Sequence, residues 1–131
     1  MIEKAVYGRL SSYTGLTDLV GTSPVRVYPL KLPQNPTYPA VTYGRVSTVR
    51  PSAMGLDTGD AQSRVQVDSW DSTELGTLNV SEQVRAALQR WTGTAGGVQV
   101  THGHVANQMM VYEEDVQKWR VIQDFILWQK E

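Results

Sequence analysis

The sequence predicts an α+β domain: a mainly antiparallel β-sheet with two helices packed on one face. Three observations lead to this class. Apolar residues recur at helical spacing in two segments, 2–13 and 74–92. Apolar and polar residues alternate in two others, 40–49 and 62–70, and 98–111 and 119–129 are expected to form further strands. Helix, strands, helix and strands therefore follow one another along the chain, an order typical of an antiparallel sheet.

Length and composition predict one globular domain spanning residues 1–131. Hydrophobic residues make up 40% of the chain and charged residues 19%, which is ordinary for a globular protein. The formal net charge of -1 argues against a broad electrostatic grip on DNA. The absence of cysteine excludes thiol catalysis, disulfides and cysteine-bound zinc. No apolar run approaches the roughly 20 residues of a membrane span, and the N-terminus lacks a secretory pattern.

The first 39 residues predict a helix followed by an extended, proline-rich connection. The helix over 2–13 ends near Gly15, and 17–20 adds one short turn. A short strand is expected within 25–30. Four prolines then hold the connection extended and remove backbone donors, so this segment cannot form a central strand. They are Pro29, Pro33, Pro36 and Pro39.

The middle of the chain predicts two strands and a loop between them. Residues 40–49 form the first strand and 62–70 the second, which is half-buried. The intervening stretch 51–61, "PSAMGLDTGDA", is rich in Gly, Pro and Asp. It predicts a long mobile hairpin loop.

The second half predicts a long helix and two further strands. Asp71 or Ser72 is the expected N-cap, and the helix ends before Gly93. Residues 98–111 form a strand with an irregularity around Gly103, and an acidic turn follows at 113–115. The last strand, 119–129, is apolar on both faces. It is therefore either a central strand or covered on its outer face by another copy.

No group of residues predicts an active site. His102 and His104 share one face of a strand, but no third metal ligand is evident nearby. Asp68 and Asp71 could pair as a general acid and base, but Asp68 belongs to the polar face of its strand and Asp71 fits a helix cap. A serine nucleophile would need a G-x-S-x-G elbow, which does not occur. The protein is therefore not expected to be an enzyme or to hold a cofactor or a metal.

The four tryptophans divide into two pairs. Trp91 and Trp119 are expected in the core, where large aromatic residues most often lie. Trp70 and Trp128 have polar neighbours, and aromatic residues with a polar atom are enriched at interface centres. These two are expected at subunit contacts.

An ordered set of segments resembles the tail completion proteins of long-tailed bacteriophages and gene transfer agents, also called tail terminator or head-to-tail joining proteins. The set runs "VYPLKLPQNPTYPAVTYGRVS", "SRVQVDSWDST", "VRAALQRW" and "WRVIQDFILWQ", and includes the N-terminal "IEKAVYGRL". The resemblance covers nearly the whole chain, and none of its segments is catalytic. Its specificity lies in the order of the segments.

The resemblance implies a structural virion protein that forms a ring, hexameric in the family, on the finished tail tube. Its partners would be other copies of itself, the tail tube protein and the head connector or stopper protein. DNA would pass through the lumen without sequence-specific binding. The implied location is the head–tail interface of the virion, after assembly in the host cytoplasm, with no membrane partner.

Nine residues are candidates for the subunit or partner interface. The proline segment presents a rigid, donor-poor surface that suits selective contacts, and the 51–61 loop is expected to order on docking. The candidates are Pro33, Gln34, Asn35, Pro36, Arg50, Asp57, Asp60, Trp70 and Trp128.

Two alternatives remain open on the sequence. A head-completion protein, a stopper or adaptor of the neck, would occupy the adjacent layer of the particle. An unrelated small oligomeric enzyme or ligand-binding module would instead show a pocket with perturbed ionisable groups.

Overall fold

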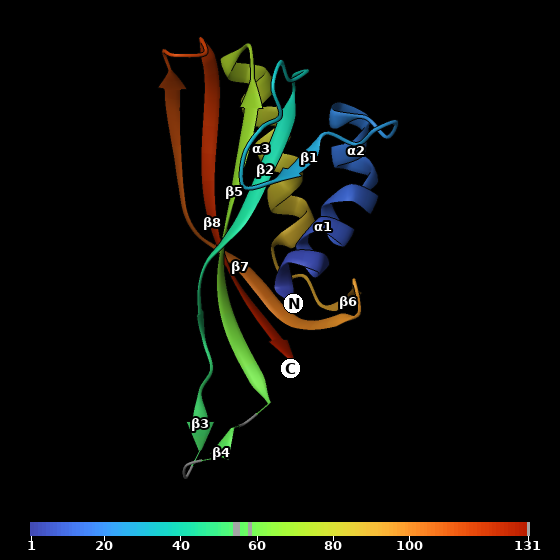
Figure 1. Cartoon of the computed structure of the whole chain (residues 1–131), viewed down its shortest axis with the longest axis vertical. Coiled ribbons are helices and arrows are strands. Elements are labelled where there is room, and N and C mark those ends of the chain that lie inside the picture. The colour runs from blue at the N-terminus through green and yellow to red at the C-terminus, as the bar shows by residue number, and fades with distance from the viewer. Residues whose placement is uncertain (54–55, 58, 131) are drawn as a thin grey trace.

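The computed structural model describes residues 1–53, 56–57 and 59–130, and confirms the α+β class (Figure 1). Three helices are present in this part of the chain rather than the two expected. The additional one is α2, of which only residues 17–20 were expected, as one short turn. The helices are α1 (Ile2–Ser12), α2 (Thr14–Val20) and α3 (Glu74–Leu88), and the strands are β1 (Val27–Pro29), β2 (Ala40–Val49), β3 (Ser52–Ala53), β4 (Leu56–Asp57), β5 (Asp60–Asp71), β6 (Gly93–Ala95), β7 (Val98–Glu113) and β8 (Lys118–Lys130).

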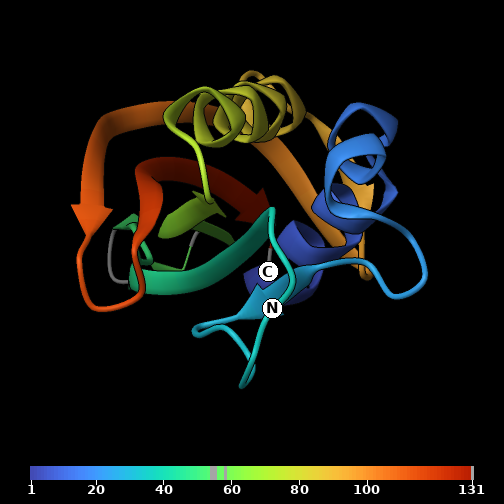
Figure 2. The same ribbon diagram turned by 90° about the horizontal axis from the view of Figure 1, so that it is seen from above.

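Six strands form one sheet in the order β1-β2-β5-β8-β7-β6, which curls strongly when seen along its length (Figure 2). All neighbours are antiparallel except β1 and β2, which run parallel with Val27 opposite Val41. The strand that contains Pro29 lies at an edge, as expected of a segment poor in backbone donors. β8 lies between β5 and β7, which confirms the central position predicted from its two apolar faces.

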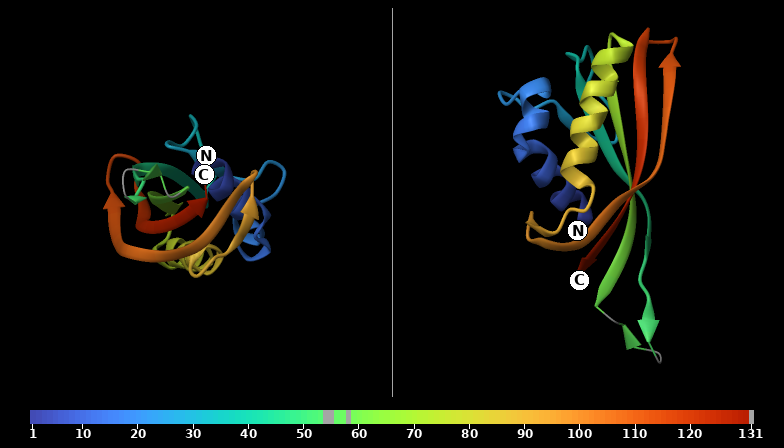
Figure 3. Two further views of the ribbon diagram at one scale, coloured as in Figure 1. Left: turned by 90° about the horizontal axis from the view of Figure 1, so that it is seen from below. Right: turned by 180° about the vertical axis from the view of Figure 1, so that it is seen from behind.

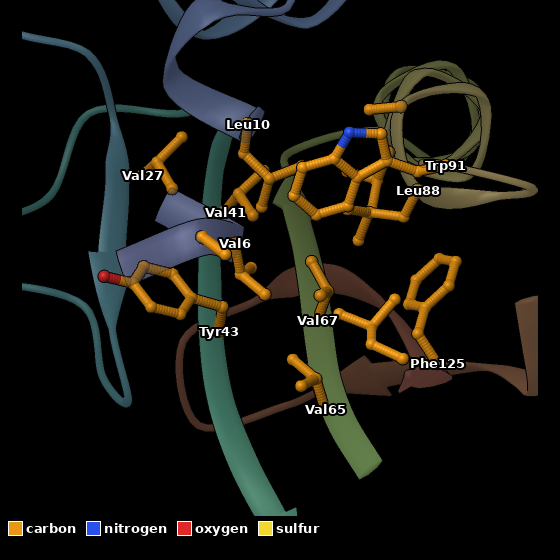
Figure 4. Packing of buried hydrophobic residues seen from close by; sticks show 14 of the residues in the cluster. Val6, Leu10, Val27, Val41, Tyr43, Val65, Val67, Leu88, Trp91 and Phe125 are labelled. Atoms are coloured by element: carbon orange, nitrogen blue, oxygen red, sulfur yellow. The ribbon is translucent and has the colours of Figure 1, made fainter. Parts of the chain in front are cut away.

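One face of the sheet packs against the helices to form the core (Figure 4). Alternate residues of each strand point to this face, so β5 contributes Val65 and Val67, and β8 contributes Phe125 and Leu127. Leu10 of α1 and Leu88 of α3 are fully buried against them. The helices therefore stabilise the sheet by burying apolar surface from one side.

The prediction for the tryptophans of the core is half right. Trp91 is 7% exposed and belongs to the core cluster. Trp119 does not, because its strand begins beyond the part of the sheet that the core residues cover. Instead its ring packs edge-on against Tyr112 across the β7–β8 hairpin, with 5.0 Å between ring centroids.

The other face of the sheet carries polar and apolar side chains in alternation with the core residues. We call this the open face, and most of its side chains are half-buried. It is formed by Gln66, Asp68 and Trp70 of β5, by Arg120, Ile122, Asp124, Ile126 and Trp128 of β8, and by His102, His104 and Met109 of β7.

The segment predicted as a mobile loop over 51–61 contains paired strands. β3 pairs with β4, Ser52 lying opposite Asp57, and β5 already begins at Asp60. Together with the outer ends of β2 and β5 these strands form a ribbon that projects from the body (Figures 1 and 3). Residues 54, 55 and 58 of the predicted loop lie outside the described part of the chain.

The predicted N-cap of α3 lies one or two residues before the true one, whereas the predicted strand irregularity is in the right place. The N-cap of α3 is Thr73, whose Oγ1 accepts a hydrogen bond from the Gly76 amide at 3.0 Å. Asp71 instead accepts from the amide of Ser72, so neither expected residue caps the helix. The irregularity around Gly103 is confirmed, because the β7–β8 register shifts on both sides of it.

Candidate interaction surfaces

The proline segment forms an exposed loop beside the edge of the sheet. Pro33, Gln34 and Asn35 are exposed, and Pro36 is half-buried. The backbone of Asn35 has a φ of 52°, a conformation that asparagine tolerates better than most residues. The four candidates of this segment thus stand together on one accessible turn.

Both ends of this loop are fixed to the sheet. At one end, the Leu30 amide donates to the Tyr43 carbonyl at 2.7 Å. At the other, the Arg26 Nε donates to the Pro39 carbonyl at 2.9 Å, and the Lys118 ammonium lies 5.1 Å from the centroid of the Tyr38 ring. The loop is therefore held at its base while its outer turn remains open to a partner.

Trp70 belongs to a charged cluster on the open face. Its indole Nε1 donates to the Thr42 hydroxyl at 3.2 Å, and the Arg120 guanidinium lies 4.9 Å from the ring centroid. The same guanidinium donates to Asp68 Oδ2 at 2.6 Å and to Glu113 Oε1 at 2.9 Å. The cluster joins β2, β5, β7 and β8 across the width of the sheet.

Asp68 is the most buried carboxylate of this cluster, with 6% of the residue exposed. Burial raises the pKa of Asp68, and the hydrogen bonds and charge of Arg120 oppose that rise without cancelling it. Gln66 donates a further hydrogen bond to the carboxylate at 3.1 Å. Several of the acceptor positions of Asp68 are thus occupied within the chain.

The hollow beside Asp68 bears on the ligand-binding alternative. It holds about 160 Å³ and is lined by Leu30, Thr42 and Gly44 as well as Gln66 and Asp68. Sites for small molecules usually hold about 300–1,000 Å³. Two groups whose pKa burial raises line this hollow, Tyr43 and Asp68, and the carboxylate of Asp68 is already bound to Arg120.

Trp128 lies on the open face at the other end of β8. It stands opposite Gln62 of β5 and His102 of β7 and is half-buried. The imidazoles of His102 and His104 lie side by side on this face, with 5.7 Å between ring centroids. Within the described residues, no third His, Cys, Asp or Glu joins them to form a possible metal site.

The remaining candidates lie in or near the ribbon. Asp60 pairs with the Lys130 ammonium at 2.7 Å, which fastens the start of β5 to the end of β8. Arg50 follows β2 and is exposed. The backbone of Asp57 lies in β4, but its side chain is outside the described part of the structure.

The structure separates the predicted residues into two groups. Trp70 and the proline segment lie toward the end of the molecule where the β7–β8 hairpin turns. Trp128 and Asp60 lie toward the ribbon. Sequence reasoning missed the Arg120 cluster, because its partners come from three strands and meet only through the sheet register. Side chains two residues apart on a strand share one face, so Arg120 could have been placed on the same face as Ile122 from the sequence.

The chain belongs to the tail completion protein gp17 family, whose sequence model matches residues 4–130. Members of this family are structural virion proteins and not enzymes, and the same holds for this chain. Comparison with curated proteins finds no match.

A solved structure shows the same fold. One chain of a structure described as "Virion of native gene transfer agent (GTA) particle" superimposes with a TM-score of 0.78. The match covers 96% of this chain and 92% of that one, at 17% sequence identity.

Among the described helices, none is long and apolar enough to cross a membrane.

Proposed function

We propose that the protein forms a ring that caps the finished tail tube and joins the tail to the head connector. The observation that carries this proposal is the family match over residues 4–130. The similarity to a chain of a gene transfer agent virion, over nearly the full length of both chains, supports it. The ring is hexameric, as the family resemblance implies, and contacts the tail tube protein on one side and the connector or stopper protein on the other.

The surfaces described above suit such a role. The proline turn at Pro33–Pro36 and the ribbon that carries Arg50, Asp57 and Asp60 provide two protruding contacts near opposite ends of the fold. Trp70 and Trp128 supply half-buried aromatic surface on the open face, where a further layer of protein would complete their burial. We assign these residues to subunit or partner contacts.

DNA passes through the lumen of this ring without sequence-specific contacts. The formal net charge of -1 supports free passage, because tight binding requires clustered cations that displace counterions from phosphates. The protein therefore acts at the head–tail joint of the virion, after assembly in the host cytoplasm.

Electron microscopy of particles from a producing strain that lacks this gene tests the proposal. The expected result is separate DNA-filled heads and free tails, with tails of abnormal length because no terminator stops their growth. Free tails of normal length beside heads that have lost their DNA would instead indicate a stopper or adaptor of the head. Intact infectious particles would overturn the assignment to the joint.

A further inference from the structure

The outer edge of β7 is covered by the chain itself as far as Val105. The Gly103 carbonyl accepts from the Arg90 amide at 2.7 Å, and the Val105 amide donates to Gln89 Oε1 at 2.8 Å. The segment that follows α3 thus covers this stretch with one backbone group and one side-chain amide. Such a cover keeps a strand edge from pairing with other chains.

Beyond the bulge at Ala106, the same edge has no strand partner among the described residues. Gln108 is turned to the helix-covered face, because the buried Gln123 donates to its Oε1 at 3.0 Å. It therefore takes the place of Val105 in the alternation of the strand. The backbone N–H and C=O groups of residues 108, 110 and 112 consequently point to the outer edge.

The opposite edge of the sheet, formed by β1, cannot continue the sheet by backbone pairing. Pro29 has no N–H, and its carbonyl already accepts from the Lys31 amide at 2.7 Å. A copy that approaches a β7 edge with this side must therefore bond to it through side chains. The exposed turn of the proline segment supplies them, because Gln34 and Asn35 each carry a donor and an acceptor, as Gln89 does.

Leu30, at the start of the proline segment, is held in an exposed position. It is 79% exposed and has a φ of 66°, a conformation rare for residues other than Gly, Asn and Asp. Its amide donates to the Tyr43 carbonyl at 2.7 Å. A Cβ atom on Gly44 would lie 2.7 Å from Leu30 Cδ2, so the leucine side chain lies over this glycine. Since Gly44 alternates with Tyr43 of the core, Leu30 borders the open face.

Leu30 lies in the same row of the sheet as the start of the free β7 edge. The register of the strands defines this row, which consists of Leu30, Gly44, Gln66, Asp124 and Asn107. The bulges of β2 and β7 lie on the ribbon side of the row and do not shift it. Asn107 points to the open face opposite Asp124, and Met109 follows it on that face with 49% of its surface exposed.

Rotation about an axis along the strands keeps every row at its height. In a ring of this kind the β7 edge of one copy meets the β1 side of the next copy at the same rows and on the same face. Leu30 of one copy then lies beside Asn107 and Met109 of its neighbour. A contact between two different patches repeats from copy to copy and forms a ring when the rotation closes, whereas two β7 edges paired across a two-fold axis would give only a dimer.

We propose that the proline segment of one copy covers the free β7 edge of the next copy. Leu30 packs against Met109, and the side-chain amides of Gln34 and Asn35 bond to the outward backbone groups of residues 108–112. The inference rests on the ring of the proposed function and adds the contact that joins its subunits.

Disulfide formation between copies tests this contact, because the chain has no cysteine. The double variant Leu30→Cys/Asn107→Cys, whose two positions share a row, is produced as the sole copy in cells that assemble particles. Purified particles are oxidised and analysed by non-reducing electrophoresis. The expected result is a ladder of covalent multimers. A bond within one copy would leave a monomer, so it cannot produce a ladder.

The matched control is Leu30→Cys/Tyr112→Cys. Its second cysteine is also exposed and lies on the same strand, but it points to the other face and is roughly 17 Å further along. A disulfide requires Cα atoms within about 7 Å of each other. This variant should therefore stay monomeric.

The variant Leu30→Asn separates assembly from folding. Asparagine tolerates the backbone conformation of residue 30 better than leucine does, so the urea concentration at the unfolding midpoint should be unchanged or higher. The amount of chain in purified particles should nevertheless fall about tenfold, because the apolar contact with Met109 is lost. Leu75→Asn makes the same change at a site that is 69% exposed on α3 and outside the contact, and it should be incorporated like wild type.

Each contrary outcome identifies what is wrong. Leu30→Cys/Asn107→Cys chains in particles without a ladder, or Leu30→Asn incorporated like wild type, would overturn the edge contact and leave the ring itself intact. Dimers from Asn107→Cys alone would show that two β7 edges pair with each other. Wild-type particles that lack the chain altogether would overturn the proposed function, and this inference with it.

Discussion

Arg120 of β8 and Asp68 of β5 form a short ion pair on the open face, with 2.6 Å between Nη2 and Oδ2. The pair links two neighbouring strands, and the guanidinium extends the link to Glu113 of β7 and the ring of Trp70. The planar fork of arginine can bind two carboxylates while stacking on an aromatic ring, whereas a lysine ammonium cannot.

Replacement of Arg120 by Met should destabilise the fold by about 3 kcal/mol, because it leaves the buried Asp68 carboxylate without its counter-charge. Urea unfolding at neutral pH measures the change. The control Arg120→Lys keeps the charge but loses the fork and should fall between wild type and Arg120→Met. Equal stability of all three proteins would show that the pair contributes nothing.

Asp68 should make the protein less stable as the pH rises above the ordinary aspartate range. Its pKa in the native state is raised by burial above the ordinary value of 3.8, so the native state binds more protons than the unfolded state between these two values. The contribution of Asp68 is therefore fully present below pH 3.8 and is lost as the pH rises through the raised pKa.

The variant Asp68→Asn isolates this effect, because its side chain does not titrate. The stability of wild type relative to Asp68→Asn should decrease from acid toward neutral pH in urea unfolding measured across that range. A difference that increases with pH would mean that attraction to Arg120 outweighs burial at this site.

Thr73 caps α3 and its neighbour Ser72 does not, so alanine variants of the two should differ in stability. Thr73→Ala should lower the free energy of unfolding by about 1 kcal/mol, because it removes the hydroxyl that accepts from the Gly76 amide. Ser72→Ala should change it by less than about 0.5 kcal/mol, since Ser72 is exposed and does not cap the helix. Thermal unfolding of both variants measures the difference, and the reverse order would move the cap to Ser72.

Trp128 should contribute more to assembly than to folding. Trp128→Ala removes half-buried aromatic surface from the open face and should shift the protein toward monomer in analytical ultracentrifugation. Leu75→Ala is the matched control, because Leu75 is 69% exposed on α3 and lies outside the proposed contacts. An unchanged ring in Trp128→Ala would exclude this tryptophan from the subunit contact.

Periodicity alone predicted much of the sheet. The two apolar faces of residues 119–129 indicated a central strand, and β8 does lie between β5 and β7, although Ile122, Ile126 and Trp128 on its open face are only half-buried. Alternation also placed β2 and β5 within two residues of their ends. Trp119 shows the limit of this reasoning: its strand has the right period, but the core does not extend to that end of the hairpin.

Amino-acid composition did not reveal which residues pair in the sheet. Residues 51–61 contain Gly, Pro and Asp and suggested a loop, yet Ser52 and Ala53 pair with Asp57 and Leu56. The Arg120 cluster depends on the register that places Trp70 opposite Arg120 and Met109 opposite Ile122. Such registers are set by the whole sheet, so no local pattern around Asp68 or Glu113 could reveal the contact.

The length of β5 has a mechanical consequence. Its twelve residues, about 40 Å of extended backbone, begin in the ribbon at Asp60 and end beside Trp70 without an intervening turn. The strand is hydrogen-bonded to β8 over its whole length, so it behaves as a rod and not as a tether. One continuous pair of strands therefore joins the ribbon to the Arg120 cluster at the far end of the molecule.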